Sequence, residues 1–404
     1  MLQEPTAKTL AATPAASAVL ALLLTEGPLS RVEMARRLDL SSAAVTKAAR
    51  PLLDAGYLHE LASERTAPGS GRPVSPLAVT AEREYFVGVK VTTDDLVDEI
   101  VGVLCDLRAQ VRVSVRRPLP DRSPEAVVVE LAALVDELLD AGPDYRARTR
   151  NLGIAISGDV DRARGLVRLS ARFGWRDVPI GQLAAEATGL SVVVENDVKA
   201  LTVAEHWFGE GVGTDSFALV TVGAGIGCGI VVDGRLLTGG FGVAGEIGHI
   251  CVDPDGAPCR CGNQGCVETV ATTGAILAAA RAESGEADMT FGRAVERARA
   301  GDEAVKKVFA KAGTAIGLAV AAMVNIAGPE RIVVSGEGLD TYDLFEERIW
   351  ASFAAHAFGA AAQAPVFIRP LPFEEWARGA AAVSLRALFP QVRTHHARAL
   401  THRA

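Results

Sequence analysis

Residues 216–234 read SFALVTVGAGIGCGIVVDG, two apolar runs separated by a turn in which every second residue is glycine. Apolar runs of this length that end at glycines predict β-strands. The Asp233–Gly234 pair that follows is a dipeptide typical of tight hairpin turns. The stretch therefore predicts consecutive antiparallel strands, with a third strand in RLLTGG at residues 235–240.

The same order of elements occurs in both halves of the chain: three strands, then helices that alternate with two further strands. The first-half strands are predicted at 84–91, 96–106, 110–119, 151–157 and 190–196, and the last two of the second half at 331–336 and 364–371. This duplication predicts an α/β fold of two lobes with a cleft between them. The arrangement is similar to that of actin-like and sugar-kinase-like proteins.

The glycines of residues 223–229 have two explanations. In such a fold, glycines in the first hairpin of a lobe let the backbone approach nucleotide phosphates closely. A glycine-rich hairpin can equally be a packing device, and the turn alone does not decide between them. The matching turn of the first half, GVKVTTDD at residues 88–95, has no glycine after Gly88.

Residues 14–80 have the pattern of three helices followed by a hairpin. The first helix, PAASAVLALLLTEG, ends at Gly27. The second begins at Ser30, with Glu33 three residues later as in a capping box, and stops near Asp39. The third, SSAAVTKAARPLLDAG, begins at Ser41 or Ser42.

This third helix has one apolar face and one polar face. Val45, Ala49 and either Leu52 or Leu53 form its inward stripe. The outward residues are polar or basic, as suits a helix in the major groove of DNA. The predicted DNA-binding residues are Ser41, Ser42, Thr46, Lys47, Arg50 and, in the following hairpin, Arg72.

The hairpin consists of YLHEL and VSPLAVT on either side of a loop whose Arg65 and Arg72 are placed to reach the DNA backbone or minor groove. This is the pattern of a winged helix-turn-helix. The alternative is a plain helical subdomain with a surface hairpin, and charge does not decide, because acidic and basic residues nearly cancel here. Placement favours DNA: Glu26, Asp39 and Asp54 lie at helix ends, and the bases lie on the outward face.

The formal net charge of −8 excludes a protein whose whole surface coats nucleic acid or an anionic membrane, so any nucleic-acid contact is local. The apolar stretch at residues 314–328 is shorter than the roughly 20 residues of a spanning helix and predicts a buried helix. The apolar run near the N-terminus is not followed by a cleavage site typical of signal peptides. These features predict a cytoplasmic protein without a membrane partner.

The six cysteines are unevenly distributed. Cys105 and Cys228 stand alone in apolar runs, as core residues do, whereas the other four fall between Cys251 and Cys266. Cysteines clustered in one short segment of a long chain indicate a metal site in a reducing compartment.

The stretch HICVDPDGAPCRCGNQGCVE, residues 249–268, supplies one imidazole and three thiolates. The predicted metal ligands are His249, Cys259, Cys261 and Cys266, a set suited to tetrahedral Zn²⁺. Four protein ligands leave no position for an activated water, so we expect one structural zinc ion per chain. Cys251 is interpreted as a bystander.

At GEIGHICVDPDGAPCRCGNQGCVE, residues 245–268, the sequence resembles the ROK family, named for repressors, open reading frames and kinases. The resemblance extends over nearly the whole chain through ENDVKAL at 195–201, GVAGEIGH at 242–249 and PERIVVSGEG at 329–338. In the kinases of this family, the residue matching Asp197 is the general base for a sugar hydroxyl. Residues matching Asn196, Glu246, His249 and Glu268 bind the sugar.

The resemblance therefore implies a sugar site formed by Asn196, Asp197, Glu246, His249 and Glu268. Carboxylates and an amide that converge on a cleft can each bind a pair of hydroxyls, and a base has to lie within hydrogen-bond reach of its proton. The alternative is that Asn196 or Asp197 only caps the helix that begins there.

The chain departs from the family kinases at GVKVTTDD. Those kinases carry a D-x-G-G-T type loop, whose Asp lies near the metal–phosphate group. Here Lys90 stands in place of that Asp, Thr92 and Thr93 replace the glycines, and the Asp94–Asp95 pair repels a triphosphate. Ala224 also replaces a Thr usual in the kinases. The resemblance thus implies loss of ATP binding, and no catalytic residue is predicted.

We therefore expect a sugar-responsive transcriptional regulator of the repressor branch, which binds an inverted-repeat operator as a homodimer or homotetramer. The alternatives are an active sugar kinase that carries a DNA-binding domain, and a DNA-binding regulator that senses a partner protein. The predicted domains are a winged helix-turn-helix at 1–80, a first lobe at 81–195 completed by a helix at 374–390, a second lobe with the zinc site at 196–373, and a tail at 391–404.

Overall fold

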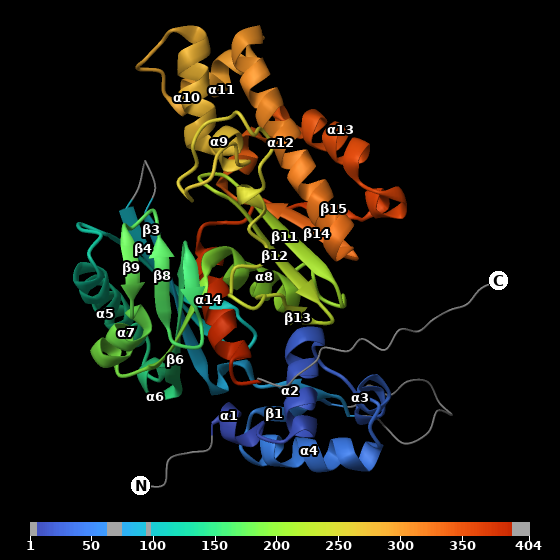
Figure 1. The fold of residues 1–404 in the computed structure, drawn as a ribbon. Helices are drawn as coiled ribbons and strands as arrows, with labels where there is room; N and C mark the ends of the chain where they lie inside the picture. Colours follow the sequence, from blue (N-terminus) through green and yellow to red (C-terminus); the bar gives the residue numbers. More distant parts are fainter. Residues whose placement is uncertain (1–5, 63–74, 94–97, 390–404) are drawn as a thin grey trace, which may run out of the picture.

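Two α/β lobes and a helical N-terminal unit make up the fold (Figure 1). The computed structural model describes residues 6–62, 75–93 and 98–389. Figure 1 shows the N-terminal unit, in blue, below the point where the lobes meet, with helix α14 (Glu374–Arg386) running between them.

The first lobe is built on a five-stranded sheet of order β10-β6-β3-β4-β5. Strands β3, β4 and β5 form an antiparallel meander, and β6 and β10 add in parallel beside β3. The strands are β3 (Tyr85–Thr93), β4 (Asp98–Asp106), β5 (Val111–Pro118), β6 (Thr149–Ile156) and β10 (Ser191–Asn196). The lobe's helices are α5 (Pro124–Asp140), α6 (Tyr145–Arg148) and α7 (Ile180–Thr188).

The second lobe repeats this topology in the order β15-β14-β11-β12-β13. Strands β11, β12 and β13 are antiparallel, and β14 and β15 add in parallel beside β11. The strands are β11 (Phe217–Val222), β12 (Ile226–Val232), β13 (Arg235–Leu236), β14 (Arg331–Ser335) and β15 (Val366–Ile368). The predicted duplication is confirmed, but the predicted third strand over residues 235–240 is only two residues long.

Helices of the second lobe surround its sheet and form a large apolar core. They are α8 (Asp197–Phe208), η2 (Ile247–His249), α9 (Glu268–Ala271), α10 (Thr273–Ser284), α11 (Phe291–Arg299), α12 (Glu303–Ala327), η3 (Glu337–Leu344), α13 (Glu346–His356) and η4 (Gly359–Gln363). Among the described residues, α12 is the one helix long and apolar enough to cross a membrane, yet most of its apolar stretch is buried inside the lobe. It is therefore a core helix, as predicted.

A small antiparallel sheet between β6 and α7 was not predicted from the sequence. It consists of β7 (Asp159–Asp161), β8 (Leu166–Ser170) and β9 (Trp175–Val178). Its strands are three to five residues long, which is too short to give a clear period-2 signal. This sheet belongs to the first lobe, and its Arg168 and Arg172 contact loops of the second lobe.

Helix α14 covers one face of the first sheet, because two glycines let it approach closely. A Cβ atom on Gly88 of β3 would lie 2.0 Å from the Ala377 carbonyl oxygen, and one on Gly153 of β6 would lie 1.9 Å from that of Ala380. Side chains alternate across a strand, so Lys90, two residues after Gly88, points to this same face. Helix α14 thus packs on the sheet of the first lobe.

The N-terminal unit contains the predicted three helices and hairpin in order. Its elements are α1 (Ala7–Leu10), α2 (Pro14–Glu26), α3 (Arg31–Leu38), α4 (Ser42–Asp54), β1 (Leu58–Glu60), β2 (Leu77–Val79) and η1 (Ala81–Arg83). Strands β1 and β2 pair antiparallel. Ser30 caps α3 as predicted, but the Glu33 side chain accepts a 2.7 Å hydrogen bond from Arg37.

The N-terminal unit and the two-lobed body share one apolar cluster. Leu20, Leu23 and Leu24 of α2 belong to the same buried cluster as Trp207 of α8 and Leu385 of α14. The joint also contains a buried carboxylate, Glu84. Its Oε2 accepts hydrogen bonds from the hydroxyl of Tyr57 at 2.7 Å and the backbone N–H of Ala7 at 3.2 Å. The unit is therefore packed against the body and not merely tethered to it.

Candidate functional site

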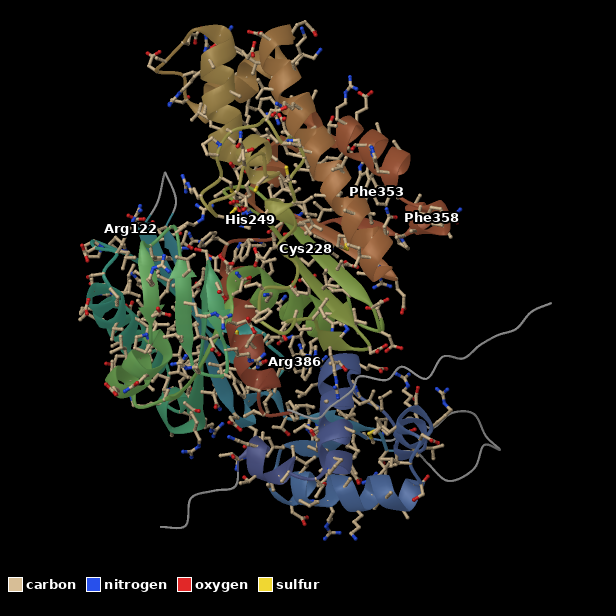
Figure 2. All side chains as sticks on the ribbon, in the orientation of Figure 1. Arg122, Cys228, His249, Phe353, Phe358 and Arg386 are labelled. Atoms are coloured by element: carbon tan, nitrogen blue, oxygen red, sulfur yellow. The ribbon has the colours of Figure 1, made fainter. Side chains whose placement is uncertain are left out.

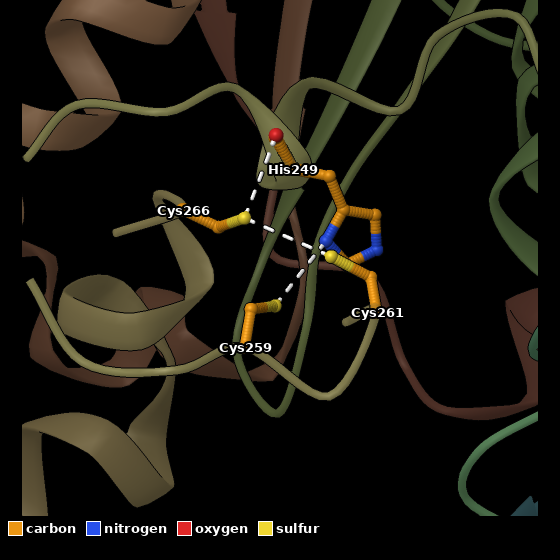
Figure 3. A group of neighbouring side chains, drawn as sticks. All are labelled: His249, Cys259, Cys261 and Cys266. Atoms are coloured by element: carbon orange, nitrogen blue, oxygen red, sulfur yellow. Dashed lines mark hydrogen bonds between the residues drawn. The ribbon is translucent and has the colours of Figure 1, made fainter. Parts of the chain in front are cut away.

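The four predicted metal ligands come together in the second lobe (Figure 3). His249 ends η2, Cys259 and Cys261 lie in the following loop, and Cys266 lies two residues before α9. Their ligand atoms all lie within 4.8 Å of one another. Cys251 is exposed and outside the group, whereas Cys105 and Cys228 are buried core residues, as expected.

The spacing of these atoms fits a zinc ion. His249 Nδ1 lies 3.6 Å from the sulfur of Cys259, and the sulfurs of Cys261 and Cys266 are 3.8 Å apart. A tetrahedral ion about 2.3 Å from each sulfur and 2.0–2.1 Å from nitrogen would set sulfur pairs ~3.8 Å apart and nitrogen–sulfur pairs ~3.6 Å apart. The donor set and its geometry therefore match a closed zinc site.

The loop can curl around this position because of its glycines. Gly265 has a φ of 64°, and a Cβ atom there would lie 1.5 Å from the Asp253 carbonyl oxygen. A side chain at residue 265 would therefore displace the loop that carries the thiolates. His249 directs Nδ1 toward the thiolates, which leaves its Nε2 on the other side of the ring (Figure 3).

The metal group is joined directly to two of the predicted sugar-binding residues. Glu246 immediately precedes η2, which ends at His249, and Glu268 begins α9, two residues after Cys266. Glu268 Oε1 also accepts a 3.0 Å hydrogen bond from the backbone N–H of Ile226 at the glycine turn. Figure 2 shows His249 on the side of the second lobe that faces the first lobe.

Glu246 lies within electrostatic range of Asp197 and Glu268, two other predicted sugar-binding residues. Burial raises the pKa of Glu246 above that of an ordinary glutamate. The nearby ammonium of Lys199 lowers this pKa, and the neighbouring carboxylates of Asp197 and Glu268 raise it. These side chains are therefore close enough to sense one another's charge. Lys199, which the sequence analysis did not single out, donates to the Gly242 carbonyl just before Glu246.

Asn196 serves as the N-cap of α8. Its Oδ1 accepts a 3.2 Å hydrogen bond from the Lys199 backbone, and its Nδ2 donates a 3.2 Å bond to the Gly158 carbonyl. The capping explanation considered for this residue is thus correct. Oδ1 and Nδ2 of Asn196 can each form one further hydrogen bond, so capping does not exclude contact with a sugar.

Asp197 forms a buried ion pair with Lys90, which the sequence analysis did not foresee. The Lys90 ammonium donates to Asp197 Oδ2 and lies 5.4 Å from the centre of the Trp376 ring, within range of a cation–π contact. Lys90 is 5 % exposed and Asp197 is 9 % exposed. The residue matching the kinases' general base is therefore bound by an internal cation.

The predicted DNA-binding face of α4 is exposed. Val45, Ala49 and Leu52 are buried, as expected. The outward residues Ser42, Thr46, Lys47 and Arg50 line a shallow, open surface hollow. Ser41 caps the helix, and Arg50 forms a solvent-exposed pair with Asp54 at 3.0 Å. Arg65, Arg72 and the Asp94–Asp95 pair lie outside the described residues.

Residues 96–386 match the ROK family. The chain is 29 % identical over 328 residues to the DNA-binding transcriptional repressor Mlc of Escherichia coli (strain K12), an alignment that covers 79 % of this chain and 80 % of Mlc. The crystal structure of a ROK family transcriptional regulator, a homologue of E. coli Mlc, superposes with a TM-score of 0.77 at 26 % identity. It covers 93 % of this chain and 96 % of that regulator.

A kinase of the same family superposes less completely. The ROK family glucokinase from Streptomyces griseus, in complex with glucose and AMPPNP, has a TM-score of 0.64 at 27 % identity. The superposition with the glucokinase covers 99 % of the glucokinase but only 74 % of this chain. The superposition with the regulator covers 93 % of this chain. Most of the part of this chain that has no counterpart in the glucokinase thus has one in the regulator.

Proposed function

The chain belongs to the ROK family, and on this premise we propose that it is a cytoplasmic, sugar-responsive transcriptional regulator that represses genes by binding operator DNA. The single observation that carries the proposal is the buried pair of Lys90 and Asp197. In an active sugar kinase, the residue matching Asp197 has to accept a proton from the sugar hydroxyl. Here Oδ2 of Asp197 already accepts a hydrogen bond from the Lys90 ammonium, which occupies the side of the carboxylate that a base would offer to the hydroxyl proton.

The sugar site is formed by Asn196, Asp197, Glu246, His249 and Glu268 in this proposal. Support comes from the shared electrostatic environment of Glu246 and from the remaining hydrogen-bonding capacity of Asn196. Lys90 donates to Oδ2 of Asp197 and the Val198 backbone N–H to Oδ1, and each carboxylate oxygen has a further lone pair that can accept a hydrogen bond from a sugar hydroxyl. The site would then bind sugar without transferring phosphate to it.

Zinc, when bound by His249, Cys259, Cys261 and Cys266, would supply structural cross-linking and no reaction chemistry. Glu246 lies three residues before the first ligand, His249, and Glu268 lies two residues after the last, Cys266. A bound ion would therefore hold both glutamates close to the metal site. His249 directs Nδ1 to the thiolates, so its Nε2 remains able to bind a sugar hydroxyl. The metal site thus sets the positions of three of the sugar-binding residues.

DNA binding is assigned to a winged helix-turn-helix formed by α2, α3, α4 and the β1–β2 hairpin. Helix α4 would lie in the major groove, with Ser41, Ser42, Thr46, Lys47 and Arg50 toward DNA, and Arg72 of the hairpin would add a contact. A single helix of this kind reads few base pairs. A homodimer or homotetramer on an inverted repeat would supply the remaining specificity.

Helix α8 provides a direct route from the sugar site to the DNA-binding unit. Its first residue is Asp197, and near its other end Trp207 is buried in the cluster shared with α2 (Figure 1). A 12-residue helix spans about 18 Å, and it moves as a rigid element. Displacement of α8 when sugar binds would therefore shift the packing beneath α2 and change the spacing of paired α4 helices.

Two assays on the full-length protein test this function. ATP consumption is measured with a panel of hexoses and amino sugars, and operator binding is measured with the same panel. We expect no turnover above background and a change in operator affinity with at least one sugar. Turnover that is lost in an Asp197→Asn variant would instead identify an active kinase that carries a DNA-binding domain. Operator binding that responds to no sugar would favour a protein partner as the signal.

A further inference from the structure

The glycine turn of the second lobe is already occupied by carboxylates of the chain itself. The turn, residues 223–225, joins β11 and β12, and its glycines leave the backbone N–H groups open to an anion. The N–H of Ala224 donates to Glu337 Oε1 at 2.6 Å, and that of Ile226 donates to Glu268 Oε1 at 3.0 Å. One N–H group of the turn and the first N–H group of β12 therefore bind carboxylates of the chain itself.

Glu337 is held in this position by the backbone around it. It lies two residues after β14, which pairs in parallel with β11, so the two strand ends lie side by side. A Cβ atom on Gly336 would lie 2.4 Å from the Val222 carbonyl oxygen, and one on Gly338 would lie 2.8 Å from the same atom. Residues 335–338 read SGEG, so Glu337 is the one large side chain in this segment. The glycines on either side of it pack tightly on the turn and hold it there.

The Glu337 carboxylate covers the open side of Gly223. A Cβ atom on Gly223 would lie 2.2 Å from the Glu337 carboxyl carbon. Glu337 is itself exposed, so its carboxylate reaches the turn from the solvent side. An external phosphate would need the same side and the same Ala224 N–H, and it would meet the negative charges of both Glu337 and Glu268.

We propose that Glu337 is a built-in anion that takes the place of a nucleotide phosphate in this turn and makes the sensor independent of nucleotides. Lys90 is the matching built-in cation on the first hairpin, where it neutralises Asp197. The anionic and the cationic part of a metal–nucleotide complex thus each have one internal counterpart. The occupied turn is a property of the chain alone, whereas nucleotide-independent sensing also rests on the proposed sugar response.

The occupied turn is tested by titrating ADP and inorganic pyrophosphate into the full-length protein by isothermal calorimetry, without added divalent metal. The variant Glu337→Gly uncovers the Ala224 N–H and removes the charge. Asp340→Asn is the matched control, because Asp340 is an exposed carboxylate three residues further along η3. We expect wild type and Asp340→Asn to bind neither ligand at millimolar concentration, and Glu337→Gly to bind at least one of them at least tenfold more tightly.

Binding of ADP or pyrophosphate to wild type as tightly as to Glu337→Gly would overturn the proposal, as would a Glu337→Gly protein that is folded and binds neither. Glu337→Gln removes the charge but keeps the side-chain size, and a gain in affinity is expected for it too. This variant carries the test if Glu337→Gly does not fold. The titrations contain neither DNA nor sugar, so their outcome is independent of the proposed regulatory function.

Nucleotide-independent sensing is tested by a second measurement, the sugar affinity of wild type with and without millimolar ADP. An unchanged sugar affinity would support nucleotide-independent sensing, and a changed one would contradict it.

Discussion

The ammonium group of Lys90 and the carboxylate of Asp197, 107 residues apart in the sequence, form an ion pair beneath helix α14. Strand β3 contributes the cation, and the first turn of α8 contributes the anion. Because both groups are buried, each depends on the other for compensation of its charge. The pair therefore joins the two halves of the duplicated fold through Asp197, the residue that matches the general base of the family kinases.

Replacement of Lys90 by methionine should lower the free energy of unfolding by about 3–5 kcal/mol, because Asp197 would remain buried without its cation. Lys307→Met on the exposed side of α12 is the control and should cost less than about 0.5 kcal/mol. Urea unfolding measures both. The double variant Lys90→Met/Asp197→Asn should recover part of the loss, and a single variant as stable as wild type would show that the pair is not formed in solution.

Lys47→Ala and Arg50→Ala should each weaken operator binding by about 1–3 kcal/mol if these side chains contact bases. Lys307→Ala removes the same charge far from α4 and should leave affinity unchanged. Asp54→Ala releases Arg50 from its exposed ion pair and is expected to preserve or improve binding. Fluorescence anisotropy at several salt concentrations provides the measurement. If Lys47→Ala and Arg50→Ala both bind the operator as tightly as wild type while deletion of residues 63–74 abolishes binding, the hairpin and not α4 recognises the DNA.

The purified protein should contain close to one zinc ion per chain, and Cys261→Ser should lose it. Cys251→Ser is the matched control, because this exposed cysteine lies outside the ligand group and should not affect the metal content. Metal analysis of thiol-reduced samples measures this directly. Glu268→Ala should keep its zinc and lose sugar binding. Sugar affinity that survives zinc removal unchanged would separate the metal site from the sensor.

Trp207→Phe tests whether α8 transmits the signal. Loss of aromatic surface from the buried cluster should cost about 1–3 kcal/mol of stability and loosen the contact between α8 and α2. Sugar affinity and operator affinity, measured separately, are expected to stay close to wild type, while the effect of sugar on operator binding decreases. Trp350→Phe on α13 is the control, because Trp350 packs against the second-lobe core. An unchanged sugar effect in Trp207→Phe would exclude this route.

The duplicated topology, the N-terminal helices and the metal ligands could be predicted because their signals are local. Apolar runs bounded by glycines, caps such as Ser30 and Ser41, and four ligands within 18 residues need no knowledge of tertiary contacts. The exposed face of α4 followed from helix periodicity alone. The sugar-site residues, by contrast, rested on family resemblance, and the structure adds their common electrostatic environment.

The remaining features depend on contacts between distant segments. No periodicity links Lys90 to Asp197 or Glu337 to Ala224, since each pair is formed by strand order and by glycines that let backbones approach. The β7–β9 sheet was missed because its strands are three to five residues long. The capping role of Asn196 was foreseen as an alternative, but the sequence could not decide between a cap and a ligand contact.

Sugar-dependent binding to a selected operator is the direct measurement of a sugar-responsive repressor. DNA sites are selected from a random library with the purified, zinc-loaded protein, and affinity for the enriched site is then measured at fixed salt with and without each sugar of a panel. We expect enrichment of an inverted repeat and at least a tenfold change in operator affinity with one sugar, a change that Glu268→Ala abolishes. Failure to enrich any site, or an operator affinity that no sugar alters while sugar-dependent ATP consumption is detected, would contradict this expectation.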